Sequence, residues 1–283
     1  NAMIEGASPE VTGLAFCAAP ARRASKGSVM SQSEILAVRS TLICSTQMVS
    51  FFSSRETTMP GCFAEVSHLP DVRALASQLK RSFTDEGEIN GDEYPQIKRI
   101  EKAILSVRQE IESRLSKMMH SSGLDQVLQE KVITTRNDRY VLLVKANMKG
   151  RLKGTVHDVS ASSSTLFVEP EAVAELSDEM FMRKAELVRE TEKILAELSE
   201  TVGAEADSIS RHESFASRID LLCGQARLSR DLRCGEPVLI EECILELFSA
   251  RHPVLQAMIG NENVPNDIVL GKNHKCILIT GAN

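Results

Sequence analysis

Two long segments of the chain carry apolar residues at steps of three and four, the spacing of one face of an α-helix. They cover residues 97–119 and 176–202, and a third stretch of similar pattern covers residues 205–232. Apolar seams of this length are typical of helices that pack against one another along their axes. The pattern therefore predicts long antiparallel helices, with Ile104 and Ile194 in the buried seam.

The residues before the first seam predict shorter helices. One begins at Ser31, where Glu34 three residues later completes a capping box, and it continues to about residue 52. A second is expected over residues 70–83. Residues 4–30 are rich in Ala, Gly, Ser and Pro and predict a loosely structured lead-in.

Between the two long seams the apolar period changes from that of a helix to that of a strand. Runs of β-branched and aliphatic residues at 139–145, 154–158 and 164–170 are separated by turn-forming residues. They predict a small antiparallel β unit at the far end of the long helices.

Composition agrees with a helical protein, because aromatic residues make up 4% of the 283 residues and sheet-rich proteins usually carry more. The seven cysteines are scattered and include no Cys-x-x-Cys pair, which is typical of reduced thiols in the cytoplasm. No apolar run reaches the roughly 18 residues that span a bilayer. We therefore expect a cytoplasmic protein without membrane contact.

Charge is unevenly distributed along the chain. The whole chain carries −6, whereas residues 131–157 hold seven basic residues and one acid, Asp138, which gives seven minus one, or +6. Such segregation is typical of a surface that binds a polyanion. The candidate nucleic-acid contacts in this window are Arg136, Arg139, Lys145, Lys149, Arg151 and Lys153.

The spacing of these basic residues indicates how they would bind. Lys149, Arg151 and Lys153 occupy alternate positions, so in an extended chain they would share one face. Tyr140 stands alone, without a row of aromatic residues, which favours contact with the phosphate backbone over stacked bases. The alternative is a solvated hairpin whose lysines only protect an edge strand.

The sequence contains no complete catalytic or metal-binding set. His157 and Asp158 are the only adjacent pair of metal-ligating type in the basic region, and one pair is not a site. The serines within residues 160–164 are not part of a Gly-x-Ser-x-Gly nucleophile elbow, so the sequence does not indicate a serine hydrolase. We expect no catalytic residue, no metal site and no cofactor in this chain itself.

The C-terminal residues form a different pattern, an apolar run over residues 277–279 followed by Thr280 and Gly281. A strand that ends in this way opens a phosphate-binding P-loop, whose Gly-Lys-Ser/Thr would follow Asn283. We therefore expect that the chain on its own neither binds nor hydrolyses ATP.

Several segments together resemble the second bacterial branch of the MutS family. They are RYVLLVKA at 139–146, GTVHDVSAS at 154–162, TLFVEPE at 165–171, and the region 250–283 with ARHPVL and VPNDI ahead of the final strand. The resemblance implies a helical core and lever leading to an ABC-type ATPase that dimerises around nucleotide, with a C-terminal Smr nuclease module. It also implies branched-DNA binding, suppression of recombination, and handling of collided ribosomes.

The resemblance also implies a partial nucleotide site. Val264, Pro265 and Asn266 would lie near the adenine, and residues 251–253 would support the same wall. The opening of the phosphate loop would be Thr280, Gly281, Ala282 and Asn283, with Ala282 where the family usually has Pro. ATP and Mg would be cofactors of the full-length protein, which would be an ATPase and an Smr-type endonuclease.

The expected fold is mainly α: an elongated helical core and long lever helices with a small antiparallel β insert, ending in the first strands of an α/β ATPase domain. Five segments are expected: a flexible lead-in (1–30), a helical core (31–120), a basic β-rich insert (121–175), returning lever helices (176–236) and ATPase strands (237–283). The expected function is to grip branched or mismatched DNA and couple it to ATP state, as a homodimer. The alternative is a structural or dimerisation arm, or a ribosome- and RNA-binding module.

Overall fold

The computed structural model describes residues 8–121 and 123–278. The chain is mainly α with small antiparallel sheets, and it divides into two compact units. Among the described residues the first unit comprises residues 8–14, 44–69 and 211–278, and the second comprises residues 15–43 and 70–210. Two helices, α2 (Gln32–Ser53) and α7 (Ala206–Leu232), contribute residues to both units.

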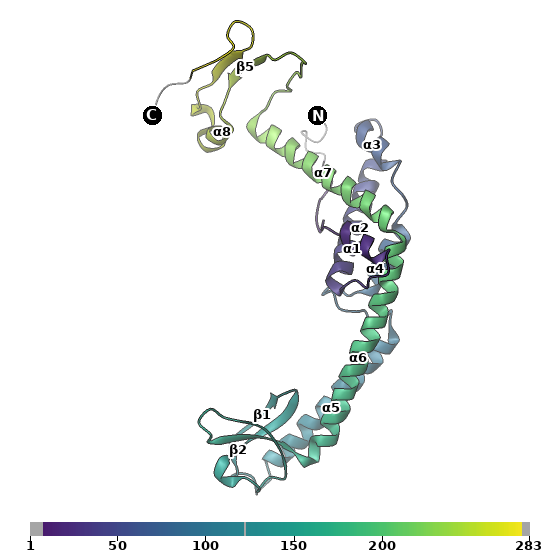
Figure 1. Ribbon diagram of the computed structural model, residues 1–283, viewed down its shortest axis with the longest axis vertical. Coiled ribbons are helices and arrows are strands. Elements are labelled where there is room, and N and C mark those ends of the chain that lie inside the picture. Colours follow the sequence, from purple (N-terminus) through teal and green to yellow (C-terminus); the bar gives the residue numbers. More distant parts are fainter. Residues whose placement is uncertain (1–7, 122, 279–283) are drawn as a thin grey trace. The chain divides into compact units, whose positions relative to one another are not determined.

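Two long helices dominate the second unit, α5 (Pro95–Met119) and α6 (Glu171–Ala204). They pack side by side over much of their length (Figure 1). Ile97 near the start of α5 shares a buried cluster with Ile194 near the end of α6, so the pair is antiparallel. The predicted long helices are confirmed, with Ile194 2% exposed and Ile104 half-buried.

One end of this helix pair belongs to a helical core. The shorter helices there are α1 (Ala18–Ala24), the first half of α2, and α4 (Arg73–Ser82). The residues buried together come from all of these helices: Ala21, Ile35, Val38, Leu42, Leu75, Leu79, Leu198 and Val202. Helix α1 lies in the stretch for which a loose lead-in was expected, and it is a structural element that the sequence analysis did not predict.

The other end of the helix pair carries a four-stranded antiparallel sheet in the order β1-β2-β4-β3. Its strands are β1 (Leu128–Arg136), β2 (Arg139–Lys145), β3 (Gly154–Val159) and β4 (Thr165–Pro170). Alternate residues of β2 and β4, such as Leu142 and its partner Val168, pack with Ile111, Leu115 and Met180 of the helices. The three predicted strands are confirmed, and β1 is an additional edge strand.

The first unit contains a second helical cluster and a two-stranded sheet. Helix α3 (Pro60–Val66) and the adjoining parts of α2 and α7 bury Met48, Phe52, Phe215, Ile219 and Cys223. Strands β5 (Leu245–Ala250) and β6 (Asn266–Leu270) pair antiparallel, with α8 (Pro253–Ile259) between them in sequence. Short 3-10 turns occur at Ala146–Met148 and Gly260–Glu262.

Helix α2 is long and apolar enough to meet the length and composition criteria for a membrane span. Its apolar residues Ile35, Val38, Met48 and Phe52 are fully buried within the protein. The core helix of a folded domain meets the same criteria, so the pattern of α2 is explained by internal packing.

Candidate nucleic-acid interface

The connection between β2 and β3, residues 146–153, presents three basic side chains to solvent. A 3-10 turn at its start is followed by Gly150 with φ 91°, a left-handed conformation that Gly adopts without strain. The amide of Arg151 donates to the carbonyl of Met148 at 3.1 Å. The segment is therefore a compact turn, and the expectation that Lys149, Arg151 and Lys153 lie in extended chain is wrong.

One apolar residue anchors this turn to the sheet. Leu152 is 9% exposed and packs in the cluster beneath the sheet, between Arg151 and Lys153, which are both exposed. The amide of Glu171 donates to the carbonyl of Lys153 at 3.1 Å and fixes the end of the turn. We call Lys149, Arg151 and Lys153 the basic turn; among the described residues none of the three forms an ion pair.

Arg139, another of the six predicted nucleic-acid contacts, instead lies at the end of the sheet and contacts two acidic side chains. Its Nη1 lies 2.6 Å from Oδ1 of Asp178 and 3.4 Å from Oε1 of Glu169. The hydrogen bond that the guanidinium donates to Asp178, together with the charge of Glu169, raises the pKa of Arg139. Its contacts link β2 to β4 and to α6, so its charge is largely compensated within the protein.

Arg136 and Lys145 are also engaged by neighbouring groups. The guanidinium of Arg136 lies 4.4 Å above the ring of Phe167 and 3.4 Å from the carboxylate of Asp158. The ammonium of Lys145 donates to the carbonyl of Gln126 at 3.1 Å. The structure thus separates the six predicted contacts into three engaged residues and the three of the basic turn.

Sequence reasoning missed the buried carboxylate of Glu169. Nε2 of His157 lies 2.7 Å from its Oε2, and the Glu169 side chain is only 5% exposed. His157 lies in a β-bulge between Val156 and Asp158, and its side chain reaches this carboxylate although Thr155 is the residue directly opposite Glu169. The one signal in the sequence was the alternation of side chains along a strand, which places Glu169 on the same face as Phe167. Phe167 is buried, so burial of Glu169 could have been expected.

The candidate nucleotide residues lie at the start of β6. Val264 is 74% exposed, and Pro265 and Asn266 are exposed as well. Asn263 beside them is buried, and its side-chain amide donates to the carbonyl of His252 at 3.2 Å. The segments around 252 and 264 are thereby brought together. Thr280, Gly281, Ala282 and Asn283 lie outside the described residues.

Apolar side chains around this region are unusually exposed. Those with the largest exposed fractions are Val238, Leu239, Phe248, Met258, Val264 and Leu278. Apolar surface of this extent is typical of regions that pack against another segment or partner.

Comparison with known proteins gives long similarities to proteins named Endonuclease MutS2. The chain is 31% identical to that of Geobacillus sp. (strain WCH70) over 268 residues, 93% of this chain and 33% of the relative. It is 32% identical to that of Bacillus cytotoxicus over 265 residues, and 31% identical to that of Symbiobacterium thermophilum over 271 residues. These cover 93% and 96% of this chain, and each corresponds to 33% of the relative.

The chain therefore spans about a third of the length of the curated relatives it matches. No protein-family model matches it. The similarity runs through the helix pair, the sheet and the basic turn, since it covers nearly the whole chain. Nearly the whole chain is thus similar to about a third of proteins named Endonuclease MutS2.

Proposed function

We propose that this chain is the nucleic-acid-gripping core and lever of a MutS-type ATPase of the second bacterial branch, acting in the cytoplasm. In the full-length protein, as a homodimer, it would couple ATP state to binding of branched or mismatched DNA and so suppress recombination. The full-length protein would also be an ATPase that uses ATP and Mg, and an Smr-type endonuclease. The relatives' name, Endonuclease MutS2, supports a protein that acts on nucleic acid.

The observation that carries the proposal is the basic turn. Lys149, Arg151 and Lys153 project from a turn fixed by Leu152 and by backbone hydrogen bonds, and no acid occurs between residues 145 and 157. Exposed cations on a rigid support neutralise phosphates without reading bases. This arrangement favours binding to many sequences with a strong dependence on salt.

The helix pair supplies a mechanical connection. Helices α5 and α6 pack against the sheet at one end and enter the helical core of the same unit at the other. At 1.5 Å per residue, the 34 residues of α6 extend about 50 Å. A paired helix of this length transmits a displacement at the sheet to the core, which is what a lever requires.

The exposed apolar residues of 238–278 support the ATPase part of the proposal. If β5, β6 and α8 are the first elements of an α/β ATPase, the rest of that domain covers Phe248, Met258 and Val264. Val264, Pro265 and Asn266 then flank the adenine.

A second candidate function is a structural or dimerisation arm, or a ribosome- and RNA-binding module. It is favoured by apolar side chains exposed along the helix pair, namely Leu105, Phe181, Met182 and Val188. Under this candidate these side chains contact protein, and the basic turn is only solvated or contacts structured RNA.

Binding titrations with duplex DNA, a four-way junction and structured RNA test the proposal. The test variant is Lys149→Ala/Arg151→Ala/Lys153→Ala. The control, Lys80→Ala/Arg99→Ala/Lys102→Ala, removes the same residue types from exposed helix positions without ion pairs among the described residues. We expect at least tenfold weaker binding for the test variant only, as for loss of several phosphate contacts. Equal binding by both variants would overturn the proposal, and binding of RNA alone would favour the second candidate.

A further inference from the structure

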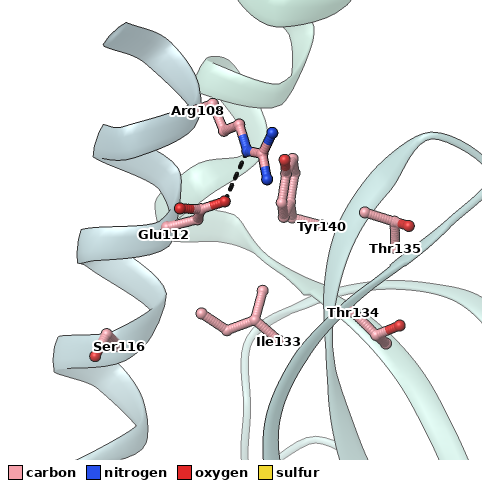
Figure 2. Close-up of a pocket in the computed structure, with 7 residues that line it drawn as sticks. All are labelled: Arg108, Glu112, Ser116, Ile133, Thr134, Thr135 and Tyr140. Carbon is pink, nitrogen blue, oxygen red and sulfur yellow. Dashed lines mark hydrogen bonds and ion pairs between the residues drawn. The ribbon is translucent and has the colours of Figure 1, made fainter. Parts of the chain in front are cut away.

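A cavity of about 560 Å³, open to solvent, lies between α5 and the sheet (Figure 2). It is separate from the basic turn, which follows the opposite end of β2. Helix α5 provides one wall, and β1 with the start of β2 provides the other. Its lining residues are Arg108, Glu112, Ser116, Ile133, Thr134, Thr135 and Tyr140.

The helix wall presents a hydrogen-bond donor and an acceptor side by side. Arg108, Glu112 and Ser116 are four residues apart and therefore share one helix face. Nε of Arg108 donates to Oε1 of Glu112 at 2.8 Å, and both side chains are about half exposed. This bond, together with the charge of Glu112, raises the pKa of the Arg108 guanidinium. Within the part of the chain that the structure describes, Oε2 of Glu112 and the Nη groups of Arg108 form no other hydrogen bond, so a ligand can bind them.

The sheet wall presents a flat ring. Tyr140 and Ile133 lie on the face of the sheet that packs towards the helices. Figure 2 shows the Tyr140 ring beside the guanidinium of Arg108, with Ile133 at a level between Glu112 and Ser116. Stacking surface, a carboxylate and a guanidinium therefore border one space.

A ligand that satisfies all three groups is a flat heterocycle with donors and acceptors on its edges. Nucleobases stack on tyrosine when they leave a strand. Arginine donates to O6 and N7 of guanine. Guanine is also the base with two adjacent donors, N1–H and N2–H, for a carboxylate. The hydroxyls of Ser116 and Thr135 can accompany a sugar or phosphate.

We propose that this cavity receives one unstacked guanine of a nucleic-acid strand, between Tyr140 and the Arg108–Glu112 pair. The proposal rests on the proposed nucleic-acid function and adds a base preference to it. A single base needs only one aromatic ring, so it is compatible with the lack of an aromatic row. Tyr140 and Lys145 are five residues apart on β2, about 17 Å, so one strand can reach both the cavity and the basic turn.

Oligonucleotide binding tests the preference. The probes are a 15-nucleotide thymidine oligomer, the same oligomer with one central guanine, and their uridine and guanine RNA equivalents. We expect the guanine to tighten binding about tenfold. Glu112→Gln should reduce this preference to twofold or less. Glu110→Gln, which alters a matching exposed ion pair with Arg114 on the same helix, should retain it. The DNA and RNA arms show which strand supplies the base.

The variant that lacks the basic turn separates the two proposals. This variant should weaken binding of the thymidine oligomer and of the guanine-containing oligomer by the same factor, so the ratio of their affinities should stay unchanged. Equal binding of both oligomers by the unmodified chain would overturn the guanine site and leave the proposed function standing.

A second readout applies if no oligomer binds, which would itself contradict the proposed function. The chain has two tyrosines, Tyr94 and Tyr140, so tyrosine-selective ¹³C labelling gives two sets of signals. Guanosine monophosphate at millimolar concentration should shift those of Tyr140 and not those of Tyr94, and thymidine monophosphate should shift neither. Unchanged Tyr140 signals with guanosine monophosphate would overturn the site.

Discussion

Nε2 of His157 lies 2.7 Å from Oε2 of Glu169, and this pair ties β3 to β4 inside the sheet. The second oxygen of the same carboxylate faces Arg139 at 3.4 Å. Because Glu169 is buried, its negative charge depends on these two partners for compensation. The network fixes the strands that flank the basic turn.

Glu169→Ala should therefore lower the free energy of unfolding by about 1 to 3 kcal/mol, since it removes the hydrogen-bond partner of the mostly buried His157, whereas Arg139 keeps Asp178. Urea unfolding measures the loss. Glu179→Ala, which breaks an exposed pair with Arg183, should change stability by no more than about 0.5 kcal/mol. Equal stability of the two variants would show that the Glu169 network does not stabilise the fold.

The capping box predicted at the start of α2 is present. The amide of Ser31 donates to Oε2 of Glu34 at 2.9 Å, and the amide of Glu34 donates to Oγ of Ser31 at 3.3 Å. Ser31→Ala should lower the free energy of unfolding by about 1 kcal/mol, as for other N-cap residues. The measurement is urea unfolding at pH 7, and an unchanged midpoint would contradict the role of the cap.

The same capping box predicts that the free energy of unfolding depends on pH. The hydrogen bond from the backbone of Ser31, with the hydroxyl of Ser31 and the charge of Arg23, lowers the pKa of Glu34. A carboxyl whose folded pKa is lowered stabilises the fold above its unfolded pKa, and this contribution is lost as pH falls through the folded value. Glu34→Gln should thus be less stable than the unmodified chain at pH 7, and the difference should vanish in acid. A difference that persists in acid would assign the effect to packing.

Gly203 permits a close approach of α6 to the end of α1 in the helical core. A Cβ at this position would lie 2.7 Å from the carbonyl carbon of Ala24 and from the amide nitrogen of Ser25. Gly203→Ala should destabilise the chain by about 2 kcal/mol, because α1 has to move. Gly224→Ala on α7, where a Cβ meets nothing within 4 Å, should instead stabilise by up to about 1 kcal/mol. Thermal unfolding compares the two variants, and equal shifts would refute the close packing of α1 on α6.

Periodicity predicted the elements whose burial is regular. Helices α5 and α6 follow from apolar residues repeated over many turns, and strands β2 and β4 follow from short runs of β-branched and aliphatic residues between turn-forming residues. Strand β1 was missed because two register shifts, between Leu128 and Ile133, break its alternation. Helix α1 was missed because its buried residues, Ala21 and Ala24, are too small to produce an apolar pattern.

The candidate site was predictable as a region but not residue by residue. Net charge identified the window 131–157, because charge is a sum over sequence. Which cations are engaged depends on partners distant in sequence, such as Asp178 for Arg139. The compact form of the basic turn depends on Gly150 and on the burial of Leu152, neither of which alternation can reveal.

The salt dependence of duplex-DNA binding tests the central claim most directly, namely that the basic turn grips the phosphate backbone. Each phosphate neutralised contributes about 0.9 to the slope of log K against log salt. Lys149→Ala/Arg151→Ala/Lys153→Ala should flatten that slope by about two to three units and leave stability nearly unchanged. The Lys80, Arg99 and Lys102 control should keep the original slope. A triple variant with unaltered affinity and slope would contradict the account and assign the basic turn to a solvated hairpin.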